Sequence, residues 1–177
     1  MKTSRIPRRN FLQASAATAA LATAETSAQQ KTSPTRRSLI AEENAKPGAL
    51  DWQLTRVRLD KNLGFRAPTI EGYCSHQSII AGETLNLFVS TNPGAKFIVE
   101  IFRMGFYGGR GARLMTTLGP LAGQKQPDPE IAANRLRECR WEPTTRLVIP
   151  REWPSGVYLG RLTTVPDSAR EPYWQSY

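Results

Sequence analysis

Two segments of alternating apolar and polar residues, separated by a turn, constrain the fold of this chain more than any other feature. Residues 84–91 and 96–102 show the alternation, and Asn92-Pro93-Gly94 stands between them. A period of two places the apolar side chains on one face of a strand, and a Pro-Gly pair favours a turn. The pattern therefore predicts an antiparallel hairpin with one buried face. Its apolar positions are Leu85, Leu87, Val89, Phe97, Val99 and Ile101.

Other short segments with strand character recur at a spacing of roughly 8–12 residues, with turn signals between them. We therefore expect an all-β chain of about seven strands, in which residues 50–177 form one antiparallel β-sandwich. The last strand begins near Tyr173 and the sequence stops at Tyr177. We expect this strand to be incomplete and the domain to be truncated at its C-terminus. Residues 66–74 predict an extended lead-in to a first core strand, and residues 52–59 predict a bulged strand or an extended segment. The further strand segments are residues 113–118, 136–141, 146–150 and 157–163.

The first 28 residues resemble a twin-arginine export signal. The motif consists of Arg8, Arg9, Phe11 and Leu12. An uncharged, alanine-rich stretch follows it, which is too short and too weakly apolar for a stable membrane span of about 20 residues. We expect the twin-arginine translocation machinery to export the chain to the periplasm or the extracellular space. Small residues suited to signal cleavage lie at Ala24 and Ala28.

Residues 29–49 are polar and lack aromatic side chains, so we expect a disordered linker, with a possible helical turn at residues 38–44. The net charge is +9, and four of these positive charges lie in the first 24 residues. The remaining basic residues are scattered and form no helical stripe. The charge therefore reflects the targeting segment, and it does not indicate a nucleic-acid partner.

The sequence contains no recognisable catalytic constellation, and no cofactor or metal site is expected. His76 is the only histidine, and neighbouring Cys74 and Ser75 do not supply the ligand set that a metal requires. We expect it to be a surface or turn residue. Cys74 and Cys139 are the only cysteines, and they form either a disulfide across the sandwich or two buried thiols. A disulfide closing this loop would stabilise the fold by about 4 kcal/mol in the chain-entropy account.

The segment after the predicted hairpin is rich in glycine and aromatic residues. Residues 104–111 contain four glycines, which favours a loop with positive φ angles or close backbone approach. A phosphate-binding loop would be followed by a helix, whereas a strand is predicted here, so nucleotide binding is not indicated. Two interpretations stay open, an interdomain or ligand surface and a cap on the sandwich core. The candidate residues are Arg103, Phe106, Tyr107 and Trp153.

Several motifs together resemble one known family. They are Ile70-Glu-Gly-Tyr-Cys-Ser75, Ala81-Gly-Glu-Thr-Leu85, Phe102-Arg-Met-Gly-Phe-Tyr-Gly-Gly109 and Ile149-Pro-Arg-Glu-Trp-Pro-Ser-Gly-Val-Tyr158. From about residue 70 to 177 the chain resembles the immunoglobulin-like region that precedes the catalytic domain in proteins similar to the N,N-dimethylformamidase large (beta) subunit. The resemblance implies an immunoglobulin-like sandwich, with metal-dependent amide hydrolysis in a larger domain that follows. No catalytic or metal residue of the family has a counterpart in this sequence.

The resemblance implies a non-catalytic accessory domain, present here as a fragment of an exported N,N-dimethylformamidase-like protein. Its partner would be the missing catalytic domain, in the same or a neighbouring chain. The alternative is a stand-alone extracellular β-sandwich module that binds carbohydrate or protein, since this fold hosts such functions widely. We expect no enzymatic activity in these 177 residues.

Overall fold

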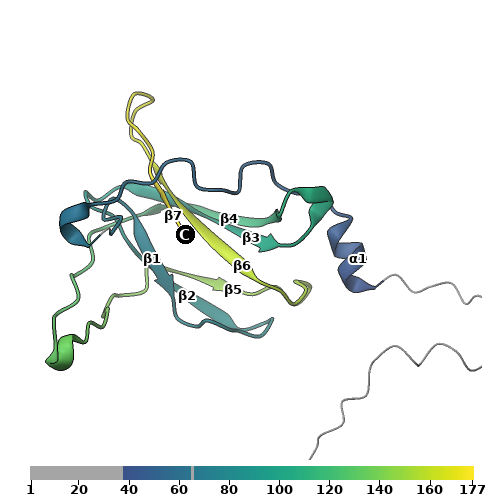
Figure 1. The fold of residues 1–177 in the computed structure, drawn as a ribbon, viewed down its shortest axis with the longest axis horizontal. Coiled ribbons are helices and arrows are strands. Elements are labelled where there is room, and N and C mark those ends of the chain that lie inside the picture. The colour runs from purple at the N-terminus through teal and green to yellow at the C-terminus, as the bar shows by residue number, and fades with distance from the viewer. Residues whose placement is uncertain (1–37, 65) are drawn as a thin grey trace, which may run out of the picture. The chain divides into compact units, whose positions relative to one another are not determined.

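The computed structural model describes residues 38–64 and 66–177 (Figure 1). The predicted signal motif, Arg8, Arg9, Phe11 and Leu12, lies outside the described residues, so export stays a prediction. Among the residues described, no helix has the length and apolarity needed to cross a bilayer.

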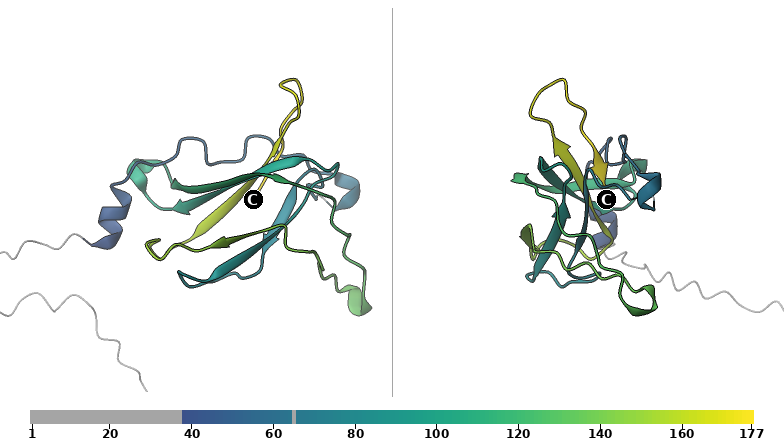
Figure 2. Two further views of the ribbon diagram at one scale, coloured as in Figure 1. Left: turned by 180° about the vertical axis from the view of Figure 1, so that it is seen from behind. Right: turned by 90° about the vertical axis from the view of Figure 1, so that its left-hand side faces the viewer.

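The described residues form two antiparallel sheets that pack face to face (Figures 1 and 2). The smaller sheet has the strand order β1-β2-β5, and the larger has the order β4-β3-β6-β7. This arrangement confirms the predicted all-β sandwich. The predicted hairpin of residues 84–91 and 96–102 is wrong, because these two strands do not pair and the turn at Asn92-Pro93-Gly94 carries the chain from one sheet to the other. The strands are β1 (Glu71–Cys74), β2 (Thr84–Ser90), β3 (Lys96–Met104), β4 (Ala112–Ala122), β5 (Thr145–Val148), β6 (Tyr158–Val165) and β7 (Gln175–Ser176).

The inward-facing residues of both sheets form the core. The predicted alternation is confirmed in the middle of β2 and β3, where Leu87, Val89, Phe97, Val99 and Ile101 are buried and the residues between them are less buried. It ends toward the C-terminus of each strand, where consecutive residues are buried. Each fully buried apolar side chain of this size stabilises the fold by about 1.5–3 kcal/mol. The core cluster consists of Ile70, Leu87, Val89, Phe97, Val99, Ile101 and Leu162.

The corner before β6 carries a feature typical of immunoglobulin-like sandwiches. Tyr158, at the start of β6, donates a hydrogen bond of 2.5 Å from its hydroxyl to the carbonyl oxygen of Pro154. A tyrosine at the start of the sixth strand that bonds back to the preceding backbone is the tyrosine corner of this fold class. The Trp153-Pro-Ser-Gly-Val-Tyr158 motif therefore has a structural role: it fixes the turn that leads into β6.

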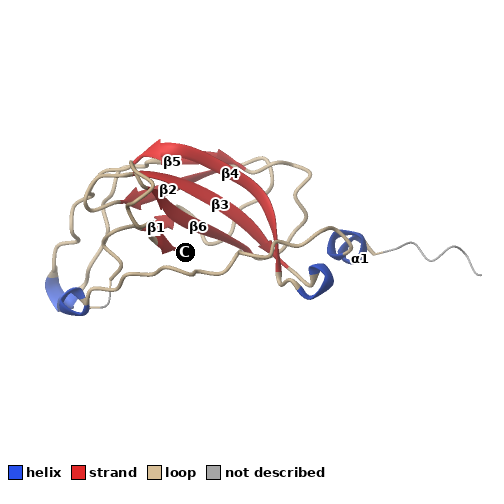
Figure 3. Cartoon of the chain, turned by 90° about the horizontal axis from the view of Figure 1, so that it is seen from above, coloured by secondary structure: helices blue, strands red, loops and turns tan. Residues whose placement is uncertain are grey.

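Among the described residues, helical structure is confined to the connections between strands and to the segment before them (Figure 3). Ser38 caps α1 through its hydroxyl oxygen, which accepts a hydrogen bond of 3.2 Å from the Ala41 amide. The ordered helix corrects the expectation of disorder for the end of the 29–49 linker, from residue 38 onward. The helical segments are α1 (Leu39–Asn44) and the 3₁₀ turns η1 (Lys61–Leu63), η2 (Tyr107–Gly109) and η3 (Ala133–Arg135).

One expected strand is absent, and one is longer than expected. Residues 136–141 form no strand. Residues 52–59, for which a bulged strand or an extended segment was expected, form no strand and run beside the larger sheet, where the Gln175 amide of β7 donates a hydrogen bond of 2.8 Å to the carbonyl oxygen of Arg56. Trp52 is held there by a hydrogen bond of 2.8 Å from its indole nitrogen to the carbonyl oxygen of Arg110. β4 extends to Ala122, four residues beyond the predicted end, because the chain continues to pair with β3 after an irregularity in the register.

Candidate functional site

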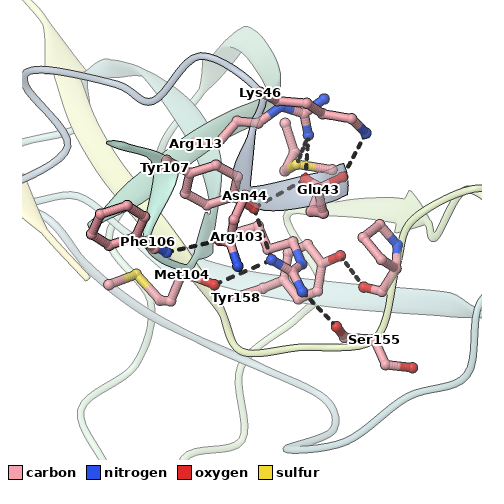
Figure 4. A network of polar contacts seen from close by, with 12 residues as sticks. Glu43, Asn44, Lys46, Arg103, Met104, Phe106, Tyr107, Arg113, Ser155 and Tyr158 are labelled. Carbon is pink, nitrogen blue, oxygen red and sulfur yellow. Dashed lines mark hydrogen bonds and ion pairs between the residues drawn. The ribbon is translucent and has the colours of Figure 1, made fainter. Parts of the chain in front are cut away.

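The candidate surface residues lie where β3 ends and turns into β4. The inward-facing series of β3 runs through Val99 and Ile101 to Arg103, so a charged side chain takes a position that apolar residues occupy earlier in the strand. Arg103 is only 6% exposed. A buried charge is tolerated only when hydrogen bonds replace its water shell. The partners of Arg103 therefore determine how this end of the sandwich is built (Figure 4).

Arg103 ties the β3–β4 loop to the turn before β6. One terminal nitrogen, Nη1, donates a hydrogen bond of 2.8 Å to the hydroxyl of Tyr107. The other, Nη2, donates one of 2.8 Å to the carbonyl oxygen of Ser155. Its Nε atom has no hydrogen-bond partner among the described residues. Gly156 makes this approach possible, since a Cβ there would lie 3.0 Å from the guanidinium group.

Tyr107 is the central residue of this arrangement. Its side chain is 2% exposed, and its hydroxyl accepts from Arg103 and donates to Glu43 Oε1 at 3.0 Å. Burial raises the pKa of Tyr107; the Arg103 guanidinium lowers it and the Glu43 carboxylate raises it further, so it lies above its ordinary value. The backbone of Tyr107 has φ of 41°, a left-handed conformation that bulky residues rarely adopt. Such a conformation costs about 1–3 kcal/mol and persists only where the surroundings impose it.

Glu43, on α1, completes the arrangement from outside the sandwich. Its carboxylate is 3.0 Å from Arg113 Nη1 on β4 and 2.5 Å from Lys46 Nζ. Burial raises the pKa of Glu43, but the hydrogen bonds from Lys46 and Tyr107 and the charge of Arg113 outweigh this effect and lower it. The side chain is 3% exposed. We call Glu43, Arg103, Tyr107 and Arg113 the loop network.

Phe106 lies next to the loop network, and its side chain points away from it (Figure 4). The Phe106 amide donates a hydrogen bond of 2.8 Å to Asn44 Oδ1 on α1. A Cβ at Gly105 would lie 2.7 Å from this oxygen and 2.8 Å from the Tyr107 ring, so only glycine fits. The backbone of the loop is thus held from two sides, while the Phe106 side chain is 68% exposed.

The four candidate residues do not share one exposed surface, contrary to expectation. Arg103 and Tyr107 are buried because their polar atoms find partners within the protein. Trp153 stacks on Tyr158, with ring centroids 5.2 Å apart and an angle of 7° between the planes, and it packs against the core. Phe106 alone of the four is exposed to solvent. Trp153 therefore packs onto the core, while Arg103 and Tyr107 are buried in the loop network.

Neither alternative expected for the cysteines holds in the structure: Cys74 and Cys139 form no disulfide, and both are exposed and not buried. Successive side chains of a strand point to opposite faces. Tyr73 stacks on Phe88 and reaches the Cys139 carbonyl oxygen with its hydroxyl at 3.4 Å. Cys74, the next residue, therefore points to the other face of β1. Cys139 lies in the segment that was predicted as a strand and forms none.

The remaining polar candidates form no catalytic or metal-binding cluster in the part of the chain that the structure describes. His76 is exposed, and its Nδ1 atom is 2.9 Å from the Ser75 hydroxyl. That hydroxyl also accepts a hydrogen bond of 3.1 Å from the Asn86 amide, so it serves the pairing of β1 with β2. No group of three or more His, Cys, Asp or Glu side chains that could hold a metal ion occurs among residues 38–64 and 66–177.

Comparison with known proteins gives a match for the region from β3 to the loop after β6. Residues 98–173 match the family model described as N,N-dimethylformamidase beta subunit-like, C-terminal. The matched region contains the β3–β4 loop and the tyrosine corner, and the match supports the resemblance to this family. The family model is described as C-terminal, whereas the resemblance places this region before a catalytic domain. That placement therefore stays a prediction. No curated protein and no solved structure gives a significant match.

Proposed function

We propose that this chain is a non-catalytic docking domain of an exported N,N-dimethylformamidase-like protein. Phe106 and the loop that carries it contact a catalytic domain, in the same or a neighbouring chain. Amide hydrolysis, the activity that the family resemblance implies, belongs to that partner. The metal on which this hydrolysis depends has no fitting set of ligands among the described residues, so we derive no catalytic step here.

The exposed phenyl ring of Phe106, on a loop whose backbone is strained, is the observation that carries this proposal. A buried ionic network adds little net stability compared with apolar packing, because its desolvation offsets its attraction. The left-handed Tyr107 backbone adds a further unfavourable contribution. A loop that is held in place at such a cost, with an aromatic side chain projecting from it, is typical of a binding surface.

The chemistry of the loop suits a protein partner. Aromatic side chains are enriched at the centres of protein interfaces, where they fill pockets on the partner. A loop that is ordered before binding loses little conformational entropy when the complex forms. α1, which contacts η2, adds two exposed apolar side chains, Leu39 and Ile40, and thereby extends the apolar surface at this end of the domain.

Hydrogen exchange on a mixture of two purified proteins tests this proposal. The partner is the catalytic domain of an N,N-dimethylformamidase beta-subunit-like protein encoded in the same genome. We expect slower exchange at the amides of residues 105–111 and of α1 when the partner is added. Exchange in η3, which lies on a different loop, should not change. Equal exchange with and without partner, or protection confined to η3, would contradict the proposal.

The alternative function, a stand-alone module that binds carbohydrate, stays a prediction. The relevant variant is Phe106→Ala, because Phe106 is exposed whereas Tyr107 is buried. Specific binding on a glycan array that is lost in this variant would favour the alternative over docking.

A further inference from the structure

The end of the sandwich that carries the β3–β4 loop holds more positive than negative charge. Three cations, Arg103, Arg113 and Lys46, face a single carboxylate, that of Glu43. Arg113 and Lys46 contact it directly, whereas Arg103 reaches it only through the hydroxyl of Tyr107 (Figure 4). The raised pKa of Tyr107 keeps its phenol neutral at pH 7, so the phenol balances no cation. The loop network and Lys46 therefore carry a net charge of +2, from three cations and one anion.

Arg103 is the cation of this group that has no counter-ion in contact with it. Its guanidinium donates to the hydroxyl of Tyr107 and to the carbonyl oxygens of Met104 and Ser155. Among the residues that the structure describes, no carboxylate forms a salt bridge with it. Because the side chain is 6% exposed, dissolved ions screen its charge much less than that of a surface arginine. Its positive field therefore reaches the surface of the β3–β4 loop.

The neighbouring charges do not cancel this excess. The exposed charges of α1 and the β3–β4 loop are one of each sign, Glu42 and Arg110. Residues 150–157, in the turn before β6, contribute one arginine and one glutamate. Asp51, the next carboxylate along the chain, lies toward the middle of the larger sheet, where its carbonyl oxygen accepts a hydrogen bond from Arg161. The excess positive charge therefore remains at the end of the sandwich from which Phe106 projects.

We infer that the partner's surface holds a pocket for the Phe106 ring, with carboxylates around the rim of that pocket. Arg110 and Lys46 are exposed at this end and pair with these carboxylates, while the buried Arg103 attracts them through its field. Charge complementarity of this kind guides two proteins into register and speeds their encounter. The inference rests on the proposed docking function and adds to it the chemistry of the partner's surface.

An anionic membrane would also attract these cations, but the loop suits a protein better. Stable attachment to a membrane requires two signals, such as a lipid chain with a polybasic patch, or a cluster of several Lys and Arg residues. Here the accessible cations are few, and Phe106 is the one exposed aromatic side chain of residues 105–111. The Asn44 side chain holds its backbone in one orientation. A single ring in a fixed orientation fits a pocket of matching shape, which a fluid lipid surface does not provide.

The rate of association with the catalytic domain tests this inference. Stopped-flow fluorescence follows the full 177-residue chain and its partner at about 20 mM and about 300 mM sodium chloride, on either side of physiological ionic strength. We expect the association rate constant to fall about tenfold or more at the higher concentration, because salt screens electrostatic steering. The dissociation rate constant should change much less. This comparison needs no variant, so it remains decisive even if a substitution in the loop prevents folding.

Two matched charge reversals locate the effect on the chain. Arg110→Glu reverses an exposed charge of the loop, and Arg140→Glu makes the same change before β5, at a side chain that is 87% exposed. We expect the first to slow association about tenfold at low salt and the second to leave it unchanged, with folding checked by circular dichroism. Phe106→Ala should accelerate dissociation and keep the salt dependence of association. Equal effects of the two charge reversals would contradict the inference.

Carboxyl labelling identifies the rim on the partner. Carbodiimide coupling of glycine ethyl ester modifies exposed carboxylates, and we expect Asp or Glu side chains of the catalytic domain to be protected in the complex. Binding with equal association rates at both salt concentrations, or without this protection, would overturn the inference and leave the docking function standing. No association at all would overturn both. Binding of the unmodified chain to phosphatidylglycerol vesicles in place of the catalytic domain would also overturn both.

Discussion

The hydroxyl of Tyr107 donates a hydrogen bond of 3.0 Å to Glu43 Oε1, although the two residues are 64 positions apart in the chain. This contact joins the segment before the sandwich to the β3–β4 loop. Because Arg103 donates to the same hydroxyl, one phenol links a cation of the sandwich to an anion of α1.

Tyr107→Phe should destabilise the domain by about 1–3 kcal/mol, because the substitution leaves Arg103 and the Glu43 carboxylate each without one buried hydrogen bond. The ring remains, so packing changes little. Urea unfolding followed by tryptophan fluorescence measures the difference. Tyr173→Phe serves as the control, since Tyr173 is exposed. The same loss in both variants would show that the hydroxyl of Tyr107 has no special role.

Stability should fall in acid in a way that depends on Glu43. Its pKa in the folded protein lies below the ordinary value of 4.5. A carboxylate with a lowered pKa stabilises the fold above its unfolded pKa, and this contribution is lost as the pH falls through the folded pKa. Glu43→Gln should therefore reduce stability at pH 7 and flatten the decline below about pH 4.5.

The matched control for Glu43 is its neighbour Glu42, which is exposed on the same helix. Glu42→Gln should leave both the stability at pH 7 and the acid decline as in the unmodified chain. Equal stability of Glu42→Gln and Glu43→Gln across the pH range would show that the buried ion pairs of Glu43 do not stabilise the fold.

The sandwich could be predicted from the sequence because its signals are local. Alternation in residues 84–91 and 96–102 identified the buried faces of β2 and β3. It did not identify their partners: the predicted hairpin was wrong, because β2 and β3 belong to different sheets. Alternation also predicted a strand at residues 136–141, and the structure contains none there. There Trp141 is buried by a long-range contact, with its indole nitrogen donating 2.7 Å to the Pro127 carbonyl oxygen. Periodicity shows which side chains share a face. It does not show whether the backbone of a segment pairs with another strand.

The loop network could not be predicted, because its members are far apart in sequence and their burial arises only in the folded state. Glu43 belongs to a polar segment that has the composition of a linker. The one available signal was the short helical turn expected at residues 38–44, which the structure contains as α1. Arg103 and Tyr107 were identified as candidates from the glycine-rich loop. Residue type alone does not show whether such side chains are buried or exposed.

Both cysteines should react with maleimide in the folded chain without denaturant, because the structure holds Cys74 and Cys139 as free, exposed thiols. Mass spectrometry should show two adducts per chain. Labelling that appears only after reduction would contradict this expectation, because it would show that the two thiols are joined in a disulfide.

Export should depend on the arginine pair. A fluorescent protein fused behind residues 1–49 should reach the periplasm in the natural sequence and stay in the cytoplasm when Arg8 and Arg9 are both replaced by lysine. The receptor of this pathway recognises the arginine pair as an address, and charge alone is not sufficient. The control, Lys2→Arg with Arg5→Lys, keeps the same charge outside the motif. Export of the double lysine variant would contradict the assignment.

The affinity of this chain for the N,N-dimethylformamidase-like catalytic domain tests the docking account most directly. Calorimetry should compare the unmodified chain with Phe106→Ala and with Ile131→Ala, which removes an equally exposed apolar side chain near η3. Burial of a phenylalanine on binding is worth about 1.5–3 kcal/mol, so Phe106→Ala should weaken binding about 10- to 100-fold without loss of stability. Ile131→Ala should bind as the unmodified chain does. Unchanged affinity of Phe106→Ala, or no binding by the unmodified chain, would contradict the account.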